Sequence, residues 1–471
     1  MDQVLDIQTV LSGLVKRIGE LEKEVEALRA ENAELKSRLS QNSSNSSRPP
    51  SSDAYRKRSH TSIQNEGYEK KKRGGQVGHK GSTLYQVNEP DLIIEHKPEA
   101  CTCGHHFDSS SEYELAEKRQ VFELPPPRID VYEHRIYQVK CPVCGQTHKA
   151  TFPSEVTAPA QYGNRMKAFI AILNVVCSVP LSKISQLVED LFGVSINEGT
   201  IVSFSKQLAD KLDTTDKIIQ QLIFSSEVVN ADETGIRINK KTGWLHNYST
   251  PVYTYLFANL KRGMEAIEKS GAFVKDYTGW LVHDCWMPYF NLTTAKHGLC
   301  NAHILRELQS AVENYNRVWA KQMQDFLVKL NKTPFEERLQ NRTQLEVEYD
   351  NICVFAKNEE PPPIYHFQIK RGRKKKSKSL NLLERLIVYK DNVLAFAFNQ
   401  NVPFTNNLAE RDLRTTKIKM KVSNCFRAFE GAEHYARIAS FISTARKNKQ
   451  NIFDEIHNTF CGYNFLTMEA K

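Results

Sequence analysis

The sequence predicts a multidomain protein of the α+β class. Three observations indicate it: a heptad repeat at the N-terminus, two close cysteine pairs near residues 101 and 141, and a change from helical to strand-like patterning after Ser226. A chain of 471 residues is also too long for one compact core. We expect consecutive segments with the bounds 1–40, 41–90, 91–155, 156–222, 223–310, 311–400 and 401–471.

Residues 1–40 have the pattern of a coiled-coil dimerisation helix. Apolar residues recur every seven positions in two series, interrupted at one a position by Asn32. A single buried Asn lowers stability but favours a parallel two-stranded coil in one register. The alternative is an amphipathic helix packed on the body of the protein. We expect a homodimer, held by Val4, Leu11, Ile18, Val25, Leu39 and Ile7, Leu14, Leu21, Leu28, Leu35.

Residues 41–90 change abruptly to a polar composition. The stretch QNSSNSSRPPSSD cannot bury a core, and it leads into the basic, Gly-rich stretch YEKKKRGGQVGHKGS. This composition favours a flexible arm that lies along a phosphate backbone, with a plain linker as the alternative.

Two cysteine pairs in residues 91–155 predict a zinc-ribbon-like domain. CPVCG has the usual two-residue spacing of a zinc knuckle, whereas CTCG has only one intervening residue. Four thiolates around a structural Zn²⁺ replace the core that so small a module lacks. His105, His106 or His148 can stand in for one thiolate, and reduced structural cysteines are the alternative. The predicted zinc ligands are Cys101, Cys103, Cys141 and Cys144.

Residues 156–222 read as helices with the outline of a helix-turn-helix. An apolar-periodic helix is followed by Phe192, Gly193 and Val194, and a second helix is opened by Ser195 or Asn197. We expect this region to bind DNA, although ordinary helical hairpins share the outline.

After Ser226 the chain alternates between strands and one helix. The order is strand, hairpin, strand, helix, strand, which is the opening of a ribonuclease H-like α/β core. In that fold the first and fourth strands are neighbours. Asp232 ends the first strand and Asp284 ends the fourth, so we expect the two carboxylates to converge. Glu233, the next residue, points to the opposite face of its strand.

A third acid is expected on a later helix, in VPFTNNLAERDLRTTKIKMKVS. Asn406 or Asn407 can cap this helix, and Glu410 lies in its first turn. Basic residues follow Glu410 on the same face at helical spacing. A salt-bridged surface helix is the alternative. The predicted phosphate contacts here are Arg411, Arg414, Lys417 and Lys421.

The charge balance favours a nucleic-acid partner. Basic residues number 64 and acidic residues 55, and the excess is clustered. Clustered cations bind polyanions by releasing condensed counterions, although solvated loops are the alternative for any single run. Two further runs carry predicted DNA contacts, Lys70, Lys71, Lys72, Arg73 and Arg371, Arg373.

Several other residues are possible metal ligands or base contacts, but their pattern is less specific. Cys300 and His303 form a C-x-x-H unit, but a second zinc site needs further ligands. Trp280 and Trp286 flank Asp284, where an aromatic ring either stacks on an unpaired base or packs in the core.

Some classes are excluded by the sequence. No apolar run approaches the roughly 20 residues of a membrane span, and no signal peptide is evident. Ten cysteines in so long a chain are too few for a disulfide scaffold, and close pairs indicate metal binding in a reducing compartment. A cytoplasmic protein is expected.

Together these motifs resemble the insertion sequence 66 type of bacterial transposases. The shared stretches are GGQVGHKG, CPVCG, ADETG, VHDCW, CNAHILREL, VPFTNNLAERDLR and FISTARKNKQN. The resemblance implies a DDE-type core whose acids are Asp232, Asp284 and Glu410. It also implies a helical insertion between the second and third acids, which residues 311–400 fit with helices expected in 317–330 and 336–356.

The resemblance implies a metal-dependent DNA transposase. Three hard oxygen ligands suit two Mg²⁺ or Mn²⁺ ions. The expected reaction is cleavage at the transposon ends and strand transfer into double-stranded target DNA. Small accessory proteins of the same element and association with the bacterial nucleoid are further expectations. The alternatives are a non-catalytic DNA-binding regulator and a nuclease without strand transfer.

Overall fold

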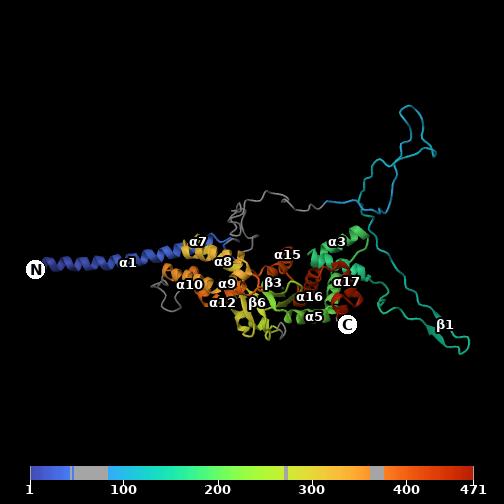
Figure 1. The fold of residues 1–471 in the computed structure, drawn as a ribbon. Coiled ribbons are helices and arrows are strands. Elements are labelled where there is room, and N and C mark those ends of the chain that lie inside the picture. Colours follow the sequence, from blue (N-terminus) through green and yellow to red (C-terminus); the bar gives the residue numbers. More distant parts are fainter. Residues whose placement is uncertain (1, 43–44, 47–82, 270–273, 361–375, 470–471) are drawn as a thin grey trace.

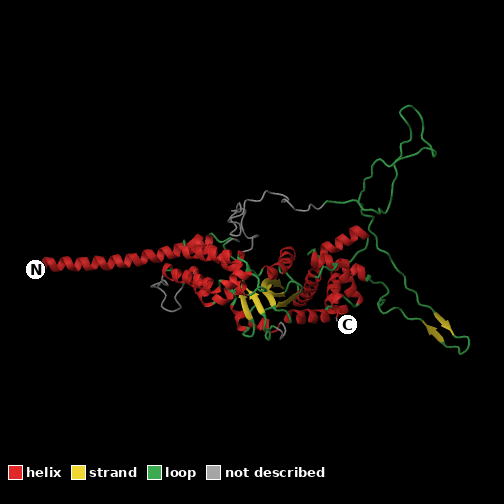
Figure 2. Ribbon diagram, in the orientation of Figure 1, coloured by secondary structure: helices red, strands yellow, loops and turns green. Residues whose placement is uncertain are grey.

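The computed structural model describes residues 2–42, 45–46, 83–269, 274–360 and 376–469 (Figure 1). Helices surround one mixed sheet, so the predicted α+β class is confirmed (Figure 2). None of the helices in these ranges is long and apolar enough to span a bilayer.

The sheet has the strand order β5-β4-β3-β6-β7. β3, β4 and β5 form an antiparallel meander. β6 pairs in parallel with the other edge of β3, and β7 pairs in parallel with β6. The predicted neighbourhood of the first and fourth strands is therefore confirmed. Asn239 and Lys240 form the β3–β4 turn with positive φ angles of 46° and 63°. The strands are β3 (Val228–Ile238), β4 (Lys241–Ser249), β5 (Thr254–Asn259), β6 (Trp280–His283) and β7 (Lys296–Leu299).

One detail of the predicted sheet is wrong. The sequence indicated that the first strand ends at Asp232, but β3 continues without a break to Ile238. The reason is that β4 pairs with β3 along its whole length, from Asn230 opposite Ser249 to Ile238 opposite Lys241. Only the parallel pairing with β6 stops before Asp232.

The first helix, α1 (Asp2–Leu39), projects from the body as one long rod (Figure 1). Its heptad leucines are exposed, with Leu14 at 54% and Leu28 at 58%. Its base is fixed to the body just after it ends, where Ser40 Oγ donates to Asn314 Oδ1 at 2.6 Å and Asn45 Nδ2 donates to Glu313 Oε2 at 2.8 Å. The predicted seam therefore lies open along the rod.

Residues 83–150 extend away from the body as long loops (Figure 1). Their regular structure is a small antiparallel hairpin of β1 (Gln138–Lys140) and β2 (Thr147–Lys149). A second tight turn follows Cys101, closed by the bridge between Ala100 and His106.

The next segment is helical, as predicted for residues 156–222. Gly193 ends α3 with a φ of 66°, and Asn197, not Ser195, caps α4 by accepting from the Thr200 amide. A π-helical turn was not predicted. The elements are α2 (Asn164–Ala171), the π-helix (Ile172–Val176), α3 (Leu181–Phe192), α4 (Glu198–Lys211) and α5 (Asp213–Phe224).

Between the second and third predicted acids the chain is mostly helical. The second expected helix is split at Asn341, and the first forms as α8. The elements are η4 (Met287–Asn291), α7 (Asn301–Tyr315), α8 (Val318–Lys332), α9 (Phe335–Gln340), α10 (Arg342–Glu359), α11 (Lys378–Val388), α12 (Lys390–Val393) and α13 (Ala395–Phe398). A short helix, α6 (Met264–Lys269), precedes β6.

These helices and the parallel strands share one hydrophobic core. Val282 of β6 and Leu299 of β7 are buried together with Trp319 of α8 and Leu382 of α11. Val402, which follows the last of these helices, also packs against the sheet. It lies so close to Gly298 of β7 that a Cβ atom there would be only 3.1 Å from a methyl group of Val402. The insertion is thus built onto the edge of the sheet.

The C-terminal helices cover the antiparallel side of the sheet. α16 packs along β5 and against α4. The helix predicted after Asn406 is divided at Leu413 into α14 and α15. The elements are α14 (Asn407–Asp412), α15 (Arg414–Ser423), α16 (Phe429–Lys447), α17 (Ile452–Cys461) and α18 (Phe465–Glu469).

Candidate functional site

One acid lies on β3 and a second directly follows β6, the parallel strand beside it. Asn230 of β3 is paired with Val282 of β6, and two residues further along the two segments are Asp232 and Asp284. The two carboxylates are close enough for the charge of Asp284 to raise the pKa of Asp232. The Asp284 carboxylate also accepts from the backbone amide of Trp286 at 3.1 Å, which fixes the turn after β6.

Two buried asparagines fasten the helix that carries Glu410 to the sheet. Asn406 donates to the carbonyl of Ala231 at 2.7 Å and accepts from Asn230 Nδ2 at 2.8 Å. Asn247, the partner of Asp232 on β4, donates to the carbonyl of Ala409 at 3.0 Å. Glu410 is in the first turn of α14, as predicted.

The predicted role of Asn406 as a capping side chain is therefore wrong. Asn406 occupies the N-cap position, but its side chain makes no capping hydrogen bond. Both groups of its amide are used by β3 instead. The hydrogen bonds that Asn406 makes with Ala231 and Asn230 of β3 thus replace a capping hydrogen bond within α14.

The acids influence one another electrostatically. Burial, together with the charges of Glu233, Asp284 and Glu410, raises the pKa of Asp232 from its ordinary 3.8 to about 8. Burial, followed by the charge of Glu233, raises the pKa of Asp284 to about 6. Carboxylates that repel in a low-dielectric site favour the neutral form unless a cation joins them.

Glu233 is held by other partners. Its carboxylate accepts from Arg262 at 2.6 Å and from the Tyr289 hydroxyl at 2.7 Å. The Arg262 guanidinium lies over the rings of Trp244 and Trp286, 4.8 Å and 4.5 Å from their centroids. Glu233 is thus bound to a cation, and Trp286 packs on that cation.

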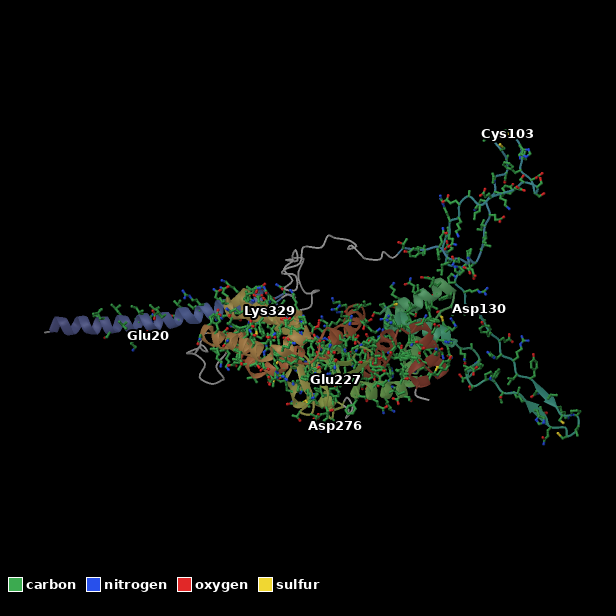
Figure 3. All side chains as sticks on the ribbon, in the orientation of Figure 1. Glu20, Cys103, Asp130, Glu227, Asp276 and Lys329 are labelled. Atoms are coloured by element: carbon green, nitrogen blue, oxygen red, sulfur yellow. The ribbon has the colours of Figure 1, made fainter. Side chains whose placement is uncertain are left out.

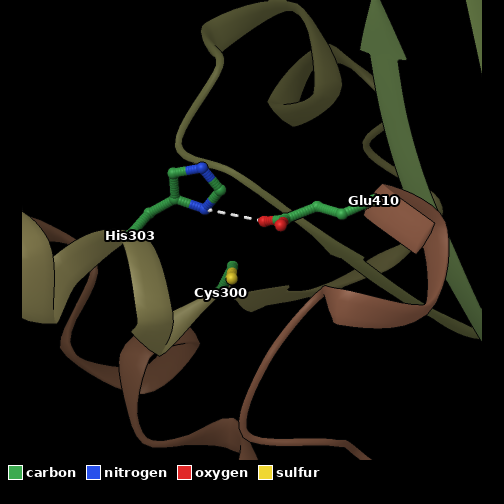
Figure 4. Close-up of side chains that lie close together, drawn as sticks. All are labelled: Cys300, His303 and Glu410. Carbon is green, nitrogen blue, oxygen red and sulfur yellow. Dashed lines mark ion pairs between the residues drawn. The ribbon is translucent and has the colours of Figure 1, made fainter. Parts of the chain in front are cut away.

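A cavity joins Asp284 to the start of α7. Its walls include Asp284, Trp286, Cys300, His303 and Arg385. Cys300 and His303 also lie close to Glu410, and Figure 4 shows the imidazole and the carboxylate pointing toward one another. In the ranges that the structure describes, one ligand atom from each of Cys300, His303 and Glu410 lies within 4.8 Å of the other two. Asp232 and Asp284 do not belong to a group of three ligands that is as close.

The predicted basic contacts fall into two sets. Arg411, Arg414, Lys417 and Lys421 are exposed on α14 and α15, beyond Glu410. The other two runs, Lys70, Lys71, Lys72, Arg73 and Arg371, Arg373, lie outside the described residues.

The predicted zinc cysteines are in two separate turns. Cys101 and Cys103 lie in the turn closed by the bridge from Ala100 to His106, and Figure 3 places Cys103 at the tip of one extended loop. Cys141 and Cys144 lie between β1 and β2, at the tip of another loop (Figure 1). The structure does not bring the four thiols together among the residues that it describes.

Sequence reasoning missed a buried ion pair behind Glu410. Asp412 accepts from Lys447 at 2.7 Å, from Ser249 at 2.6 Å and from Thr254 at 3.0 Å. The pair joins α14 to α16 and to β4 and β5. The sequence shows Lys447 only as the last residue of an apolar-periodic stretch, 429–447, which does not identify its partner.

The sheet and its acidic face define an α+β protein with a carboxylate-rich site between strands and a helix. A family model described as the Transposase IS66 family matches residues 159–434, and the chain belongs to that family. A second model, of a family of unknown function, matches residues 6–84. No curated protein matches the chain closely enough to add to this assignment.

Proposed function

We propose that the protein is a DNA transposase that cleaves transposon ends and joins them to target DNA, with Asp232, Asp284 and Glu410 as its catalytic acids. The observation that carries the proposal is a pair of hydrogen bonds donated by side-chain amides. Asn406 joins the helix of Glu410 to β3, the strand of Asp232, and Asn247 joins that helix to the neighbouring β4. Membership of the IS66 family supports the reaction class.

The sheet supports a ribonuclease H-like core. Three antiparallel strands followed by two parallel ones, with β3 central, match the order expected for that fold. In this arrangement the acids come from the first strand, the end of the fourth and a late helix. The described helices from α8 to α13 lie within residues 311–400, the range of the insertion that the resemblance implies.

The acids fit divalent metal ions. All three donors are hard carboxylate oxygens, the preferred ligands of Mg²⁺ and Mn²⁺. Burial and, after it, the neighbouring acids raise the pKa of Asp232, and Glu410 Oε1 is buried without a hydrogen-bond partner. When bound, such ions supply activation of the attacking oxygen and stabilisation of the leaving oxygen.

The rest of the chemistry belongs to the chain's own residues. Asp232 must lose its proton before it ligates, so metal binding by this site weakens as the pH falls. The exposed Arg411, Arg414 and Lys417 continue from Glu410 along the surface, where they bind the phosphates on either side of the scissile bond. Two chains paired through α1 hold two DNA ends in one complex, and the cysteine pairs form a zinc ribbon that assists DNA binding.

Strand-transfer assays test the proposal. Purified protein is incubated with pre-cut transposon-end DNA, Mg²⁺ and a plasmid target, and joined products are measured. We expect joined products from the wild type and a loss of at least about a thousandfold in Asp232→Ala, Asp284→Ala and Glu410→Ala, with DNA binding retained. Glu430→Ala, an exposed acid on α16, is the control.

The outcomes separate the three function classes. Nicked plasmid without joined ends indicates a nuclease without strand transfer. DNA binding without any metal-dependent cleavage indicates a non-catalytic regulator. Full activity in any one of the three acid variants removes that residue from the site.

A further inference from the structure

Three side chains of different chemistry converge beside the proposed catalytic acids. Cys300 is the N-cap residue of α7, and His303 lies in its first turn. Their Sγ and ring nitrogen, together with a carboxylate oxygen of Glu410, all lie within 4.8 Å of one another. The three come from two segments more than a hundred residues apart in the sequence.

Two of these ligand atoms have no hydrogen-bond partner. His303 Nδ1 and Glu410 Oε1 are buried from solvent and unpaired, 3.7 Å apart. Leaving a buried polar atom unpaired is unfavourable, and here two such atoms lie close together. That separation is too long for a hydrogen bond, yet it suits two ligands of one ion.

We propose that Cys300, His303 and Glu410 form a transition-metal site that binds Zn²⁺. A thiolate, an imidazole and a carboxylate are a borderline-soft donor set that suits Zn²⁺, whereas Mg²⁺ prefers oxygen ligands alone. Three protein ligands leave one position of a tetrahedral ion open, and the cavity that reaches Asp284 adjoins it.

The charges around the site are compatible with a dication. Arg306 Nη2 lies 3.6 Å from Glu410 Oε1, beyond hydrogen-bond length, and its Nε donates to the Ala302 carbonyl. Lys417 is the other nearby cation, and both lower the pKa of His303 together with burial, the larger cause. A neutral imidazole is the form that binds metal. The thiolate and carboxylate supply two negative charges to balance the ion.

Metal binding releases one proton. Burial raises the pKa of Cys300 to about 11, so its thiol is protonated without metal. When the sulfur–zinc bond forms, the S–H bond breaks and the proton leaves to solvent. The Cys300 sulfur also accepts from the Asn406 amide at 3.1 Å, which links the site to the residue that fastens α14.

The proposed zinc site shares Glu410 with the proposed magnesium site, and the other ligands of the two sites differ. Oε1 of Glu410 lies 3.7 Å from His303 Nδ1. Zinc binding requires no DNA and no catalysis, so it is measured independently of the proposed function.

Cobalt absorption tests the proposal. The experiment uses the full chain with the substitutions Cys101→Ser, Cys103→Ser, Cys141→Ser and Cys144→Ser, so that the loop cysteines cannot bind metal. Co²⁺ is added, and the near-ultraviolet thiolate-to-cobalt charge-transfer band is recorded, followed by titration with Zn²⁺. We expect a band equivalent to one ion per chain, which Zn²⁺ displaces.

Matched variants identify the ligands. Cys300→Ser removes the band, whereas Cys285→Ser, in the wall of the same cavity, keeps it. His303→Gln keeps the fold, because the side chain is partly exposed, and weakens Zn²⁺ binding at least tenfold, about the loss that even outer-sphere changes bring. Absence of the band, or its persistence in Cys300→Ser, overturns the site. Asp232→Ala is expected to keep the band, so failed strand transfer with a retained band counts against the proposed function alone.

Discussion

The side-chain amide of Asn406 donates to the backbone carbonyl of Ala231, 2.7 Å away, although 175 residues separate them in the chain. This bond sets Glu410, four residues after Asn406, against the strand that carries Asp232. The acidic face is therefore assembled by amide side chains that do not themselves belong to it.

Removing this contact should impair both stability and activity. Asn406→Ala leaves the Ala231 carbonyl and the Asn230 amide unpaired in the core, so we expect unfolding free energy to fall by about 1–3 kcal/mol in urea titrations. Strand transfer should fall about a hundredfold, because Glu410 is no longer held in position. Asn407→Ala, at the exposed neighbouring position, is the control. Equal effects of the two variants would show that the contact is unimportant.

The raised pKa of Asp232 predicts a loss of stability with rising pH in metal-free protein. Its folded pKa of about 8 exceeds its ordinary 3.8, so its stabilising contribution is fully present below about pH 4 and is lost as the pH rises through 8. Between pH 7 and 9 the buried histidines are neutral and do not obscure it. We expect Asp232→Asn to gain thermal stability over the wild type across this interval, and Mg²⁺ to reduce the difference. A constant difference in Tm would contradict the shift.

The Asp412–Lys447 pair should be essential for stability. Lys447→Ala leaves a carboxylate with 8% side-chain exposure uncompensated, which costs about 3–5 kcal/mol. Arg446→Ala, on the exposed side of the same helix, should change unfolding free energy by less than about 0.5 kcal/mol. Chemical denaturation of both variants measures the difference. If Lys447→Ala matched the control, the pair would be dispensable.

The exposed heptad residues of α1 predict a dimer. Ile18, 54% exposed, lies on the expected seam, so Ile18→Glu should convert the dimer to a monomer in sedimentation equilibrium. Lys16→Glu, off the seam, should leave the dimer intact. A wild type that sediments as a monomer at micromolar concentration rules out the coil.

Local patterns predicted the elements well. The heptads indicated α1, Asn197 marked the start of α4, and Glu410 lies in the first turn of its helix as its position suggested. These features depend on residues a few positions apart, whose spacing is visible in the sequence.

What the sequence did not indicate depends on distant partners. β3 continues past Asp232 because β4 pairs with it throughout, and Asn406 leaves its capping role because Ala231 and Asn230 bind its amide. Likewise, nothing near Asp412 identifies Lys447 as its counterion. The sequence shows that a residue carries a carboxylate, amide or ammonium group. It does not show whether the partner of that group is water or another buried side chain.

The shared core of the parallel strands and the insertion has a consequence for synthesis of the chain. Gly298 of β7 packs on Val402, and Asn301 donates its backbone amide to Phe404, so the edge of the sheet is covered by residues made about a hundred positions later. The ribosome adds roughly 5–20 residues per second, so Val282 and Leu299 stay exposed for several seconds before those residues are synthesised. Trp319 and Leu382, which lie within residues 311–400, belong to the same core, so a chain that lacks this region would leave Val282 and Leu299 uncovered and would aggregate.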